Sequence, residues 1–356
     1  MSTQFDSNRN PLRFRQRRSP GRRSPRVIVL AGRPLFSSFF GPAELARLGR
    51  YDWDRIGARR LAPAVVRRLA GADALVTTWD SPAFDEGLGA RCPRLRMVAH
   101  CGGEVKSRFA APLFDTLTIT NAADPMARHV AELAAAFLLY EARNVDAYRA
   151  ELRGEGSAVY ESRHLHGVEG ETLLGATVGL VGFGRIGRAL VGLLAPFGAR
   201  FVVFDPYAGR RAPRGARVAF AALDDVLRAS RLLVLAAALT DETRNLMSGE
   251  RLSRLPDGAS IINVARGGLV DLDALTAEVV RGRLRCALDV TDPEEPLPDG
   301  HPLRTAPGAI LTPHVGAGAD SVRRAMAGVA LDELDRFFGG RRVRHRVTRA
   351  MLARMT

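Results

Sequence analysis

Short apolar runs alternate with amphipathic stretches through the first third of the chain. Amphipathic stretches at 42–48 and 63–70 separate apolar runs at 27–31, 74–77, 95–99 and 117–120. Short continuous apolar runs are typical of strands buried on both faces, and helices between them allow neighbouring strands to run parallel. The pattern predicts a parallel β-sheet covered by helices.

A second series of the same kind begins at Thr177. Apolar runs at 177–181, 201–205, 232–235, 259–264, 284–290 and 310–312 alternate with helical stretches such as 223–229 and 272–281. This alternation predicts βαβ units in a second parallel sheet. The fold class we expect is α/β, with two Rossmann-like or flavodoxin-like parallel-sheet domains and a cleft between them.

Two long helical patterns connect these series. The pattern at 125–152 has an apolar stripe wide enough to pack on two surfaces, and it precedes a polar, glycine-interrupted loop or hinge at 154–170. The pattern at 321–338 begins after Asp320 as a helix cap and ends at Gly339. Because this last helix returns after the second sheet, we expect a discontinuous first domain. Its parts are 26–124 and 312–340, and the second domain is 125–311.

A glycine-rich turn follows the run at 177–181. It has the spacing G-x-G-x-x-G from Gly182 through Gly184 to Gly187, and Asp205 ends the next run, 18 residues after Gly187. The glycines permit a tight turn, the approach of backbone N–H groups to a pyrophosphate, and close packing of the helix on the strand. The alternative is a strand-turn-helix that binds nothing, but Asp205 has the spacing of a ribose-binding acid. The motif therefore predicts a dinucleotide site.

The net charge of +14 is concentrated at the two ends of the chain. Residues 1–26 hold eight arginines and one acid, and residues 341–356 hold six arginines and no acid, which leaves +1 for residues 27–340. The body is nearly neutral, so its charge does not indicate nucleic-acid binding. We expect basic tails at 1–25, which we expect to be disordered, and at 341–356. Contact between these tails and nucleic acid stays open, but we do not expect it to be the function.

The sequence gives no support for a membrane protein, an exported protein or a metal-binding protein. No apolar run reaches the ~18 residues of a membrane helix, and the run at 27–31 after Arg22 and Arg23 is too short for a signal peptide. The cysteines are odd in number and lack metal-ligand spacing: Cys92, Cys101 and Cys286. Free thiols are typical of a reducing compartment. We expect a cytoplasmic protein with no membrane contact and no metal site.

Three polar groups lie at the carboxyl ends of predicted strands in the second domain, where ligands of open α/β sheets bind. Arg266 follows the run at 259–264 and is suited to clamp a carboxylate, although alone it would be read as a surface arginine. Glu294 and Glu295 follow 284–290, and His314 follows a Thr-Pro turn. A histidine beside a carboxylate is suited to donate a proton.

Longer motifs surround these candidates. They are VAEL at 130–133, DPY at 205–207, LTDETR at 239–244, NVARGGLVD at 263–271, ALDV at 287–290, EPLP at 295–298 and TPHVG at 312–316. With these motifs, the chain resembles the NAD-dependent D-2-hydroxyacid dehydrogenases over roughly residues 95–340. The resemblance implies a two-domain enzyme, usually a homodimer. The first domain would bind the substrate, the second would bind NAD, and the active site would lie in the cleft between them.

The resemblance also implies roles for individual residues. Arg266 would hold the substrate carboxylate and polarise the 2-keto group, His314 would protonate the hydroxyl oxygen, and Glu295 would hydrogen-bond His314. An alkoxide formed by hydride transfer needs such an acid and a fixed cation. Counting from Asp289 favours Glu294 instead, so both glutamates stay open. NAD contacts are implied for Gly182, Gly184, Arg185, Ile186, Gly187, Asp205, Thr240, Ala265 and Asp289, and substrate contacts for Gly102, Gly103, Glu104 and Arg266.

Two segments depart from the family pattern and affect the expected substrate more than the reaction. Residues 100–106 read HCGGEVK in place of a small turn that closes on an Asp, and residues 236–238 are all Ala in place of His-x-Pro. Backbone N–H groups of Gly103 and Glu104 still suit a carboxylate, and Trp79 is either a pocket residue or a surface aromatic.

We expect an NAD(H)-dependent oxidoreductase that interconverts a D-2-hydroxy acid and its 2-keto acid, of the 2-keto acid, glyoxylate or hydroxypyruvate reductase type. The alternative is a dinucleotide-sensing regulator of the corepressor type, without turnover.

Overall fold

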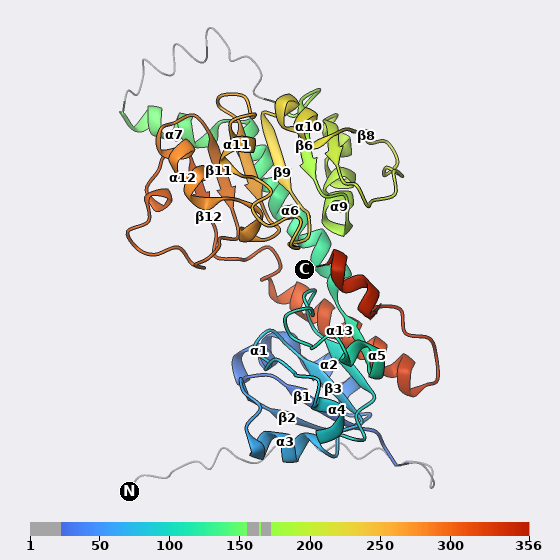
Figure 1. The fold of residues 1–356 in the computed structure, drawn as a ribbon. Coiled ribbons are helices and arrows are strands. Elements are labelled where there is room, and N and C mark those ends of the chain that lie inside the picture. The colour runs from blue at the N-terminus through green and yellow to red at the C-terminus, as the bar shows by residue number, and fades with distance from the viewer. Residues whose placement is uncertain (1–22, 155–163, 165–171, 356) are drawn as a thin grey trace, which may run out of the picture. The chain divides into compact units, whose positions relative to one another are not determined.

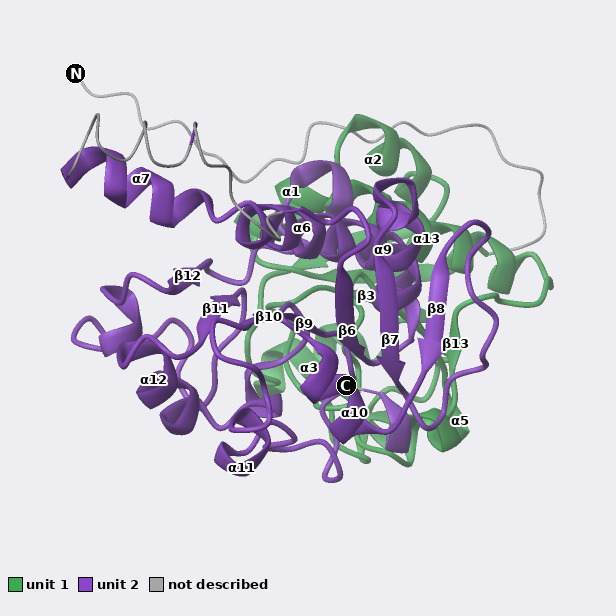
Figure 2. Ribbon diagram, turned by 90° about the horizontal axis from the view of Figure 1, so that it is seen from above, with its two compact units in different colours: residues 1–122, 323–352 green, residues 123–322, 353–356 purple. Residues whose placement is uncertain are grey.

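The computed structural model describes residues 23–154, 164 and 172–355. Within these residues, the chain forms two compact units (Figure 2). Unit 1 contains the chain up to Ala122 and Arg323–Leu352, and unit 2 contains Ala123–Val322 with the last residues. Unit 1 is therefore discontinuous, as the returning helix predicted. The return lies at 322/323, so the segment with His314 belongs to unit 2, whereas we expected it in the first domain.

Unit 1 is built on a six-stranded sheet with the order β13-β5-β4-β3-β1-β2. Figure 1 labels β1, β2 and β3 of this sheet. Its parallel strands are β1 (Arg26–Leu30), β2 (Asp52–Ile56), β3 (Ala74–Thr77), β4 (Met97–His100) and β5 (Thr118–Asn121). The helices are α1 (Arg33–Phe39), α2 (Pro42–Leu48), α3 (Pro63–Leu69), α4 (Leu88–Arg91), α5 (Leu113–Thr116) and α13 (Asp320–Phe338). Strands β3 and β4 are buried at every position, which explains their continuous apolar sequences.

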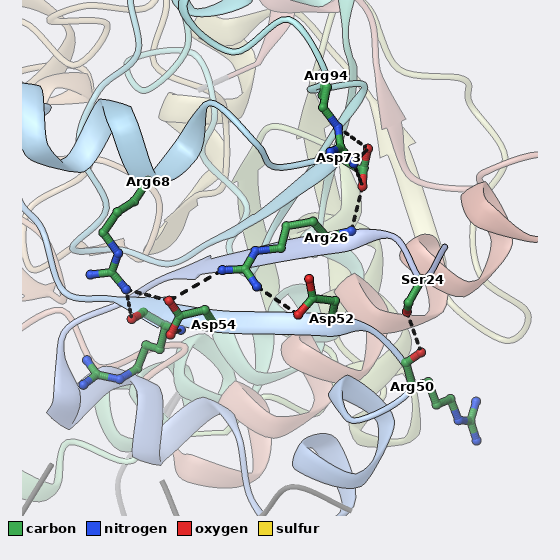
Figure 3. Close-up of polar contacts among 9 residues, drawn as sticks. Ser24, Arg26, Arg50, Asp52, Asp54, Arg68, Asp73 and Arg94 are labelled. Carbon is green, nitrogen blue, oxygen red and sulfur yellow. Dashed lines mark hydrogen bonds and ion pairs between the residues drawn. The ribbon is translucent and has the colours of Figure 1, made fainter. Parts of the chain in front are cut away.

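Charged side chains fix the start of β1 against its neighbours (Figure 3). The Arg26 guanidinium bonds to Asp52 at 2.9 Å, and its backbone N–H donates to Asp73 at 2.7 Å. Arg94 binds the same Asp73 carboxylate through Nη2 at 2.8 and 2.7 Å. Burial alone would raise the pKa of Asp73, but the hydrogen bonds from Arg94 and Arg26 lower it below its usual value.

The C-terminal segment is not the tail that its arginines predicted. Strand β13 (Arg346–Val347) pairs antiparallel with β5, and Val347 is only 1% exposed. The backbone N–H groups of Arg344 and His345 donate to the buried Glu333 carboxylate, at 2.8 and 3.3 Å. A short 3-10 helix follows, η4 (Arg349–Arg354). A few buried apolar residues and one buried acceptor therefore hold a segment whose composition is strongly basic.

Unit 2 contains a seven-stranded parallel sheet with the order β12-β11-β10-β9-β6-β7-β8. Its strands are β6 (Thr177–Val181), β7 (Arg200–Phe204), β8 (Arg217–Phe220), β9 (Leu232–Leu235), β10 (Ser260–Asn263), β11 (Arg285–Leu288) and β12 (Ala309–Leu311). The strand order reverses between β6 and β9. Ligands of open α/β sheets bind outside the carboxyl ends of the strands at such a reversal.

The helices of unit 2 are α6 (Ala123–Ala142), α7 (Val145–Gly154), α9 (Arg185–Leu194), α10 (Leu223–Ala229), α11 (Gly249–Leu252) and α12 (Leu272–Val280). Three 3-10 helices add to them, η1 (Ala195–Phe197), η2 (Gly267–Leu269) and η3 (Pro302–Arg304). The single long helix expected at 125–152 is divided, because Asn144 has a left-handed φ of 50°. Apart from His164, the loop expected at 154–170 lies outside the described residues beyond Gly154. Within the described chain, no helix is long and apolar enough to cross a membrane.

Candidate active site

The turn between β6 and α9 has the geometry that its glycines predicted. Gly182 has a φ of 98°, and a Cβ built there would lie 2.5 Å from the backbone nitrogen of Ala237. A Cβ on Gly187 would collide with the carbonyl oxygen of Gly182. Only glycine fits these two positions, since one needs a left-handed backbone and the other a close approach. Helix α9 is thereby held close against the turn.

The start of helix α9 leaves room and N–H donors for a phosphate group. A Cβ on Gly184 would meet nothing within 4 Å. Among the described residues, the backbone N–H groups of Gly184, Arg185 and Ile186 donate to no protein acceptor. Unpaired N–H groups at the start of a helix, with the positive end of its dipole, bind phosphate. These backbone groups would hold the pyrophosphate of NAD.

Asp205 lies directly after β7 and fixes the same turn. Its Oδ2 accepts from the Phe183 backbone N–H at 2.6 Å, and its Oδ1 accepts from the N–H groups of Tyr207 and Ala208, both at 2.9 Å. The carboxylate is only partly buried, so its remaining lone pairs can accept from ribose hydroxyls. Asp205 would thus position the turn and bind the adenosine ribose.

Three other residues expected at the cofactor have the following protein contacts, and their role at the cofactor stays a prediction. The Arg185 side chain forms an ion pair with Asp124 at 2.5 Å, so the backbone N–H of Arg185 remains for phosphate. The Thr240 N–H donates to the Thr243 hydroxyl at 2.8 Å. Ala265 follows β10, and its N–H donates to the side chain of Asn263 at 3.1 Å. The Thr240 and Ala265 segments both follow strands at the carboxyl edge of the sheet.

The structure brings together His314 and Glu295 from two separate loops. His314 Nδ1 lies 2.7 Å from Glu295 Oε1, and both side chains are partly exposed. Glu294, the other candidate, accepts a hydrogen bond at its backbone oxygen from the Thr291 hydroxyl at 2.5 Å. A cavity of about 600 Å³ adjoins the pair and is lined in part by Glu295 and Thr312. The geometry therefore selects Glu295 as the partner of the histidine.

Asp289 holds the loop that presents the histidine. Its carboxylate is 2% exposed and accepts from the Thr312 hydroxyl at 2.6 Å and from the backbone N–H groups of Val315 at 2.8 Å and Gly316 at 2.9 Å. Its backbone oxygen accepts from the His314 N–H at 2.9 Å. The Asp289 carboxylate thus holds this loop, and the contact with the cofactor that we expect of Asp289 stays a prediction. His314 has a φ of 53°, a strained conformation that such contacts maintain.

Arg266 lies where β10 ends and the 3-10 helix η2 begins. The buried Asn263 side chain accepts from the Ala265 N–H and donates to the Arg266 carbonyl at 2.9 Å. The Arg266 side chain donates to the Ala265 carbonyl at 2.6 Å. We did not predict a role for Asn263 or Thr312. Both residues carry the same sequence signal. Each is a polar residue at the end of an apolar strand, two residues before a predicted site residue.

The loop expected to bind substrate lies in unit 1, after β4. In the described part of the chain, the backbone N–H groups of Gly103 and Glu104 donate to no protein acceptor. The Glu104 carboxylate accepts from the N–H and the hydroxyl of Ser107, both at 2.7 Å. The carboxylate is thus oriented by Ser107. The loop retains two free N–H donors suited to an anion.

Metal chemistry finds no support among the described residues, which contain no group of three or more His, Cys, Asp or Glu arranged to hold an ion. The three cysteines are free and buried. Burial lowers the pKa of His100 to about 3, so this histidine stays neutral near neutral pH. The titratable pair at the carboxyl edge of unit 2 is therefore the principal candidate for proton transfer.

Comparison with known proteins places this geometry in a family. The NAD-binding domain of the D-isomer specific 2-hydroxyacid dehydrogenases matches residues 135–316, just over half of the chain. The chain belongs to this family. The expected NAD cofactor is thereby confirmed, because residues 135–316 are the NAD-binding domain of a D-isomer specific 2-hydroxyacid dehydrogenase.

Individual dehydrogenases of the family match more of the chain. The D-3-phosphoglycerate dehydrogenase of Methanocaldococcus jannaschii is 32% identical over 280 residues, which are 78% of this chain and 52% of the relative. The glyoxylate reductase of Pyrococcus horikoshii is 32% identical over 279 residues, 78% of this chain and 83% of the relative. The chain thus spans about half the length of the phosphoglycerate dehydrogenase. A crystal structure from Thermus thermophilus has a TM-score of 0.72 at 32% identity and covers 91% of this chain and 100% of its own.

Proposed function

We propose that this chain is an NAD(H)-dependent oxidoreductase that interconverts a D-2-hydroxy acid and its 2-keto acid. The observation that carries the proposal is the 2.7 Å contact between His314 and Glu295 at the carboxyl edge of the NAD-binding sheet. A carboxylate that holds the imidazole at Nδ1 leaves Nε2 to face the substrate, where a protonated imidazole can donate to a developing alkoxide. Family membership supports the same reaction class.

In this proposal, each polar group has one task. NADH, when bound, supplies the hydride. Arg266 binds the substrate carboxylate with its planar guanidinium and polarises the keto oxygen, His314 gives that oxygen its proton, and Glu295 orients the imidazole. Asp289 positions His314 through the loop that its carboxylate binds. The backbone N–H groups of Gly184 to Gly187 and the Asp205 carboxylate would hold the cofactor, together with the Thr240 and Ala265 segments.

The substrate class follows from the same reasoning and from the relatives. Gly102, Gly103 and Glu104 are the proposed substrate-binding residues of unit 1, through the unpaired N–H groups of Gly103 and Glu104. Relatives are named for phosphoglycerate, hydroxypyruvate and glyoxylate. We therefore propose a small 2-keto acid of this range as the substrate.

The oligomeric state and the cellular location are part of the same proposal. We propose a homodimer, on the basis of family resemblance. We propose a cytoplasmic location, supported by three free buried thiols that a reducing compartment would preserve. The basic segment at 1–25 would, at most, bind polyanions weakly in a salt-dependent manner.

A steady-state screen of NADH oxidation against glyoxylate, hydroxypyruvate, pyruvate and 2-oxobutanoate tests the proposal. Turnover of at least one acid, lost in His314→Gln, is the expected result. NADH binding without turnover of any 2-keto acid would contradict the proposal and favour a dinucleotide sensor. Calorimetric titration with NADH makes that distinction, because a sensor and an enzyme both bind the cofactor.

A further inference from the structure

Unpaired cationic and N–H donors gather around Trp79 in unit 1. The Arg323 guanidinium carbon lies 5.2 Å from the centroid of the Trp79 ring, and Nη1 donates to the Ser38 hydroxyl at 3.1 Å. The Arg323 Nε is buried and has no hydrogen-bond partner. Within the described residues, no carboxylate lies within 4.0 Å of this guanidinium. Arg323 is thus a cation held in place by an aromatic ring and a hydroxyl, without an anion.

A second arginine approaches the same tryptophan from its backbone side. Arg108 donates to the carbonyl oxygens of Ser81 at 2.6 Å and Trp79 at 3.1 Å, and its Nε is also buried without a partner. Burial lowers the pKa of Arg108, and the more distant acids Glu104 and Asp80 offset this only in part. A bound anion would favour both guanidinium charges.

The acids of this region are already engaged. Asp80 accepts from the Gly32 N–H at 2.8 Å and from the Thr78 hydroxyl at 2.7 Å. Glu104 accepts twice from Ser107. Neither carboxylate bonds to Arg108 or Arg323. The partly exposed Arg323 guanidinium therefore has no carboxylate beside it among these acids, which suits it to bind an anion.

This donor cluster adjoins the loop assigned to the substrate. A Cβ built on Gly102 would lie 2.9 Å from the indole Nε1 of Trp79 and 2.5 Å from Nε2 of His100. No protein acceptor in the described chain takes the indole N–H. The indole edge thus faces Gly102, and Arg323 lies on the ring face. A substrate bound at Gly103 and Glu104 would have its far end near these groups.

We propose that Arg323 and Trp79 form a subsite for a second anionic group of the substrate, so that the preferred 2-keto acid is a dianion. The second group is a distal carboxylate or a phosphate, because either accepts from a guanidinium and an indole N–H. This inference rests on the proposed function for the reacting end of the substrate. Trp79, left open between pocket and surface, is thereby a pocket residue.

The kinetic test compares 2-keto acids that differ only in the second anion. Hydroxypyruvate is paired with its 3-phosphate, and 2-oxobutanoate with oxaloacetate. We expect a higher kcat/KM for the dianion of at least one pair, and the preferred pair distinguishes phosphate from carboxylate. Arg323→Met keeps much of the packing on Trp79 and should raise the KM of the dianion by about ten- to hundredfold, the effect of one charge-assisted hydrogen bond. The KM of the monoanion and kcat should change by less than about threefold.

The neighbouring arginine provides the control. Arg324 pairs with Glu44 at 3.5 Å, so Arg324→Gln removes the same charge one residue away. This variant should leave the preference for the dianion intact. Equal losses for dianions and monoanions in Arg323→Met would show that the stack on Trp79 is only structural, and would overturn the subsite.

Tryptophan fluorescence tests the subsite without turnover. The chain has two tryptophans, and Trp53 stacks on Phe36. Trp53→Phe removes this second fluorophore and keeps an aromatic ring beside Phe36. In this background, malonate and inorganic phosphate should change the emission of Trp79 in a saturable manner at constant ionic strength, and Arg323→Met should abolish the change. If no 2-keto acid is reduced, the proposed function fails, but this titration still tests the subsite separately. The absence of any saturable change in emission would overturn the subsite.

Discussion

His314 Nδ1 lies 2.7 Å from Glu295 Oε1, so the two residues form a charge-assisted pair when the imidazole is protonated. The contact uses Nδ1 and leaves Nε2 for a substrate oxygen. The histidine is also held at its backbone, where its N–H donates to the Asp289 carbonyl. The pair therefore combines a fixed orientation with a charge that favours proton donation.

Glu295→Gln should lower kcat/KM of the reduction by about tenfold or more, because the uncharged amide holds the His314 ring less firmly than the carboxylate at 2.7 Å. Glu294→Gln is the matched control and should leave kcat/KM unchanged, since Glu294 accepts from Thr291 through its backbone oxygen. Steady-state kinetics of the two variants would assign the pair to Glu294 if only that variant lost activity.

Arg266→Lys should depress kcat/KM by at least about tenfold. A point ammonium cannot hold a carboxylate and a keto oxygen in one plane as the guanidinium fork does. The backbone at 265–266 should stay in place, because Asn263 binds it through the side chain. A loss smaller than about threefold, which is under ~0.7 kcal/mol, would remove Arg266 from the proposed mechanism.

NADH should be preferred to NADPH by about tenfold or more in kcat/KM. The Asp205 carboxylate accepts ribose hydroxyls and repels a 2′-phosphate. Asp205→Ala should reduce the preference. It should also weaken binding of both cofactors, since Asp205 fixes the turn through the Phe183 N–H at 2.6 Å. Equal efficiency with the two cofactors in the unaltered enzyme would contradict this account and would point to the nearby Arg210 and Arg211 as phosphate-binding residues.

The glycine-rich turn and the two sheets could be predicted from the sequence because they depend on local spacing and on the apolar pattern, whereas the pairing of a histidine with a glutamate came from the family resemblance. The left-handed φ of Gly182, for example, is expected from its position in the G-x-G-x-x-G spacing. The choice between Glu294 and Glu295 required the loop conformation, since adjacent residues differ only in direction. The part that Asp289 plays in holding the His314 loop was not predicted, because its motif does not show that a loop 23 residues later supplies its hydrogen-bond donor Thr312.

The C terminus shows a second limit. Net charge suggested a tail at 341–356, but the outcome depends on the pairing of β13 with β5 and on the burial of Val347. Both are long-range contacts. Composition averages over a segment, whereas a single buried residue and one acceptor, Glu333, can fix its path.

Asp73→Asn should destabilise the protein at neutral pH by about 2 kcal/mol, as expected for lost charge-assisted hydrogen bonds. The lowered pKa of Asp73 means that its contribution is present above the usual pKa of about 4 and is lost as the pH falls through the folded-state value. The difference between variant and parent in urea melts should therefore shrink on acidification. Asp85→Asn, in the exposed pair with Arg91, is the control and should matter much less. A difference that is constant from pH 7 to 3 would contradict the linkage.

Removal of residues 1–22 should leave kcat and Tm unchanged, whereas removal of residues 1–26 should lower Tm. The second cut takes away Arg26, which begins β1, pairs with Asp52 at 2.9 Å and donates its N–H to Asp73 at 2.7 Å (Figure 3). It also removes the Pro25 carbonyl that accepts from the Asp52 N–H at 3.1 Å. Each lost hydrogen bond contributes on the order of 1 kcal/mol, so the two cuts should differ by several degrees in a thermal melt. Turnover abolished by the shorter cut, with an unchanged Tm, would mean that the basic N-terminal segment takes part in catalysis or substrate binding.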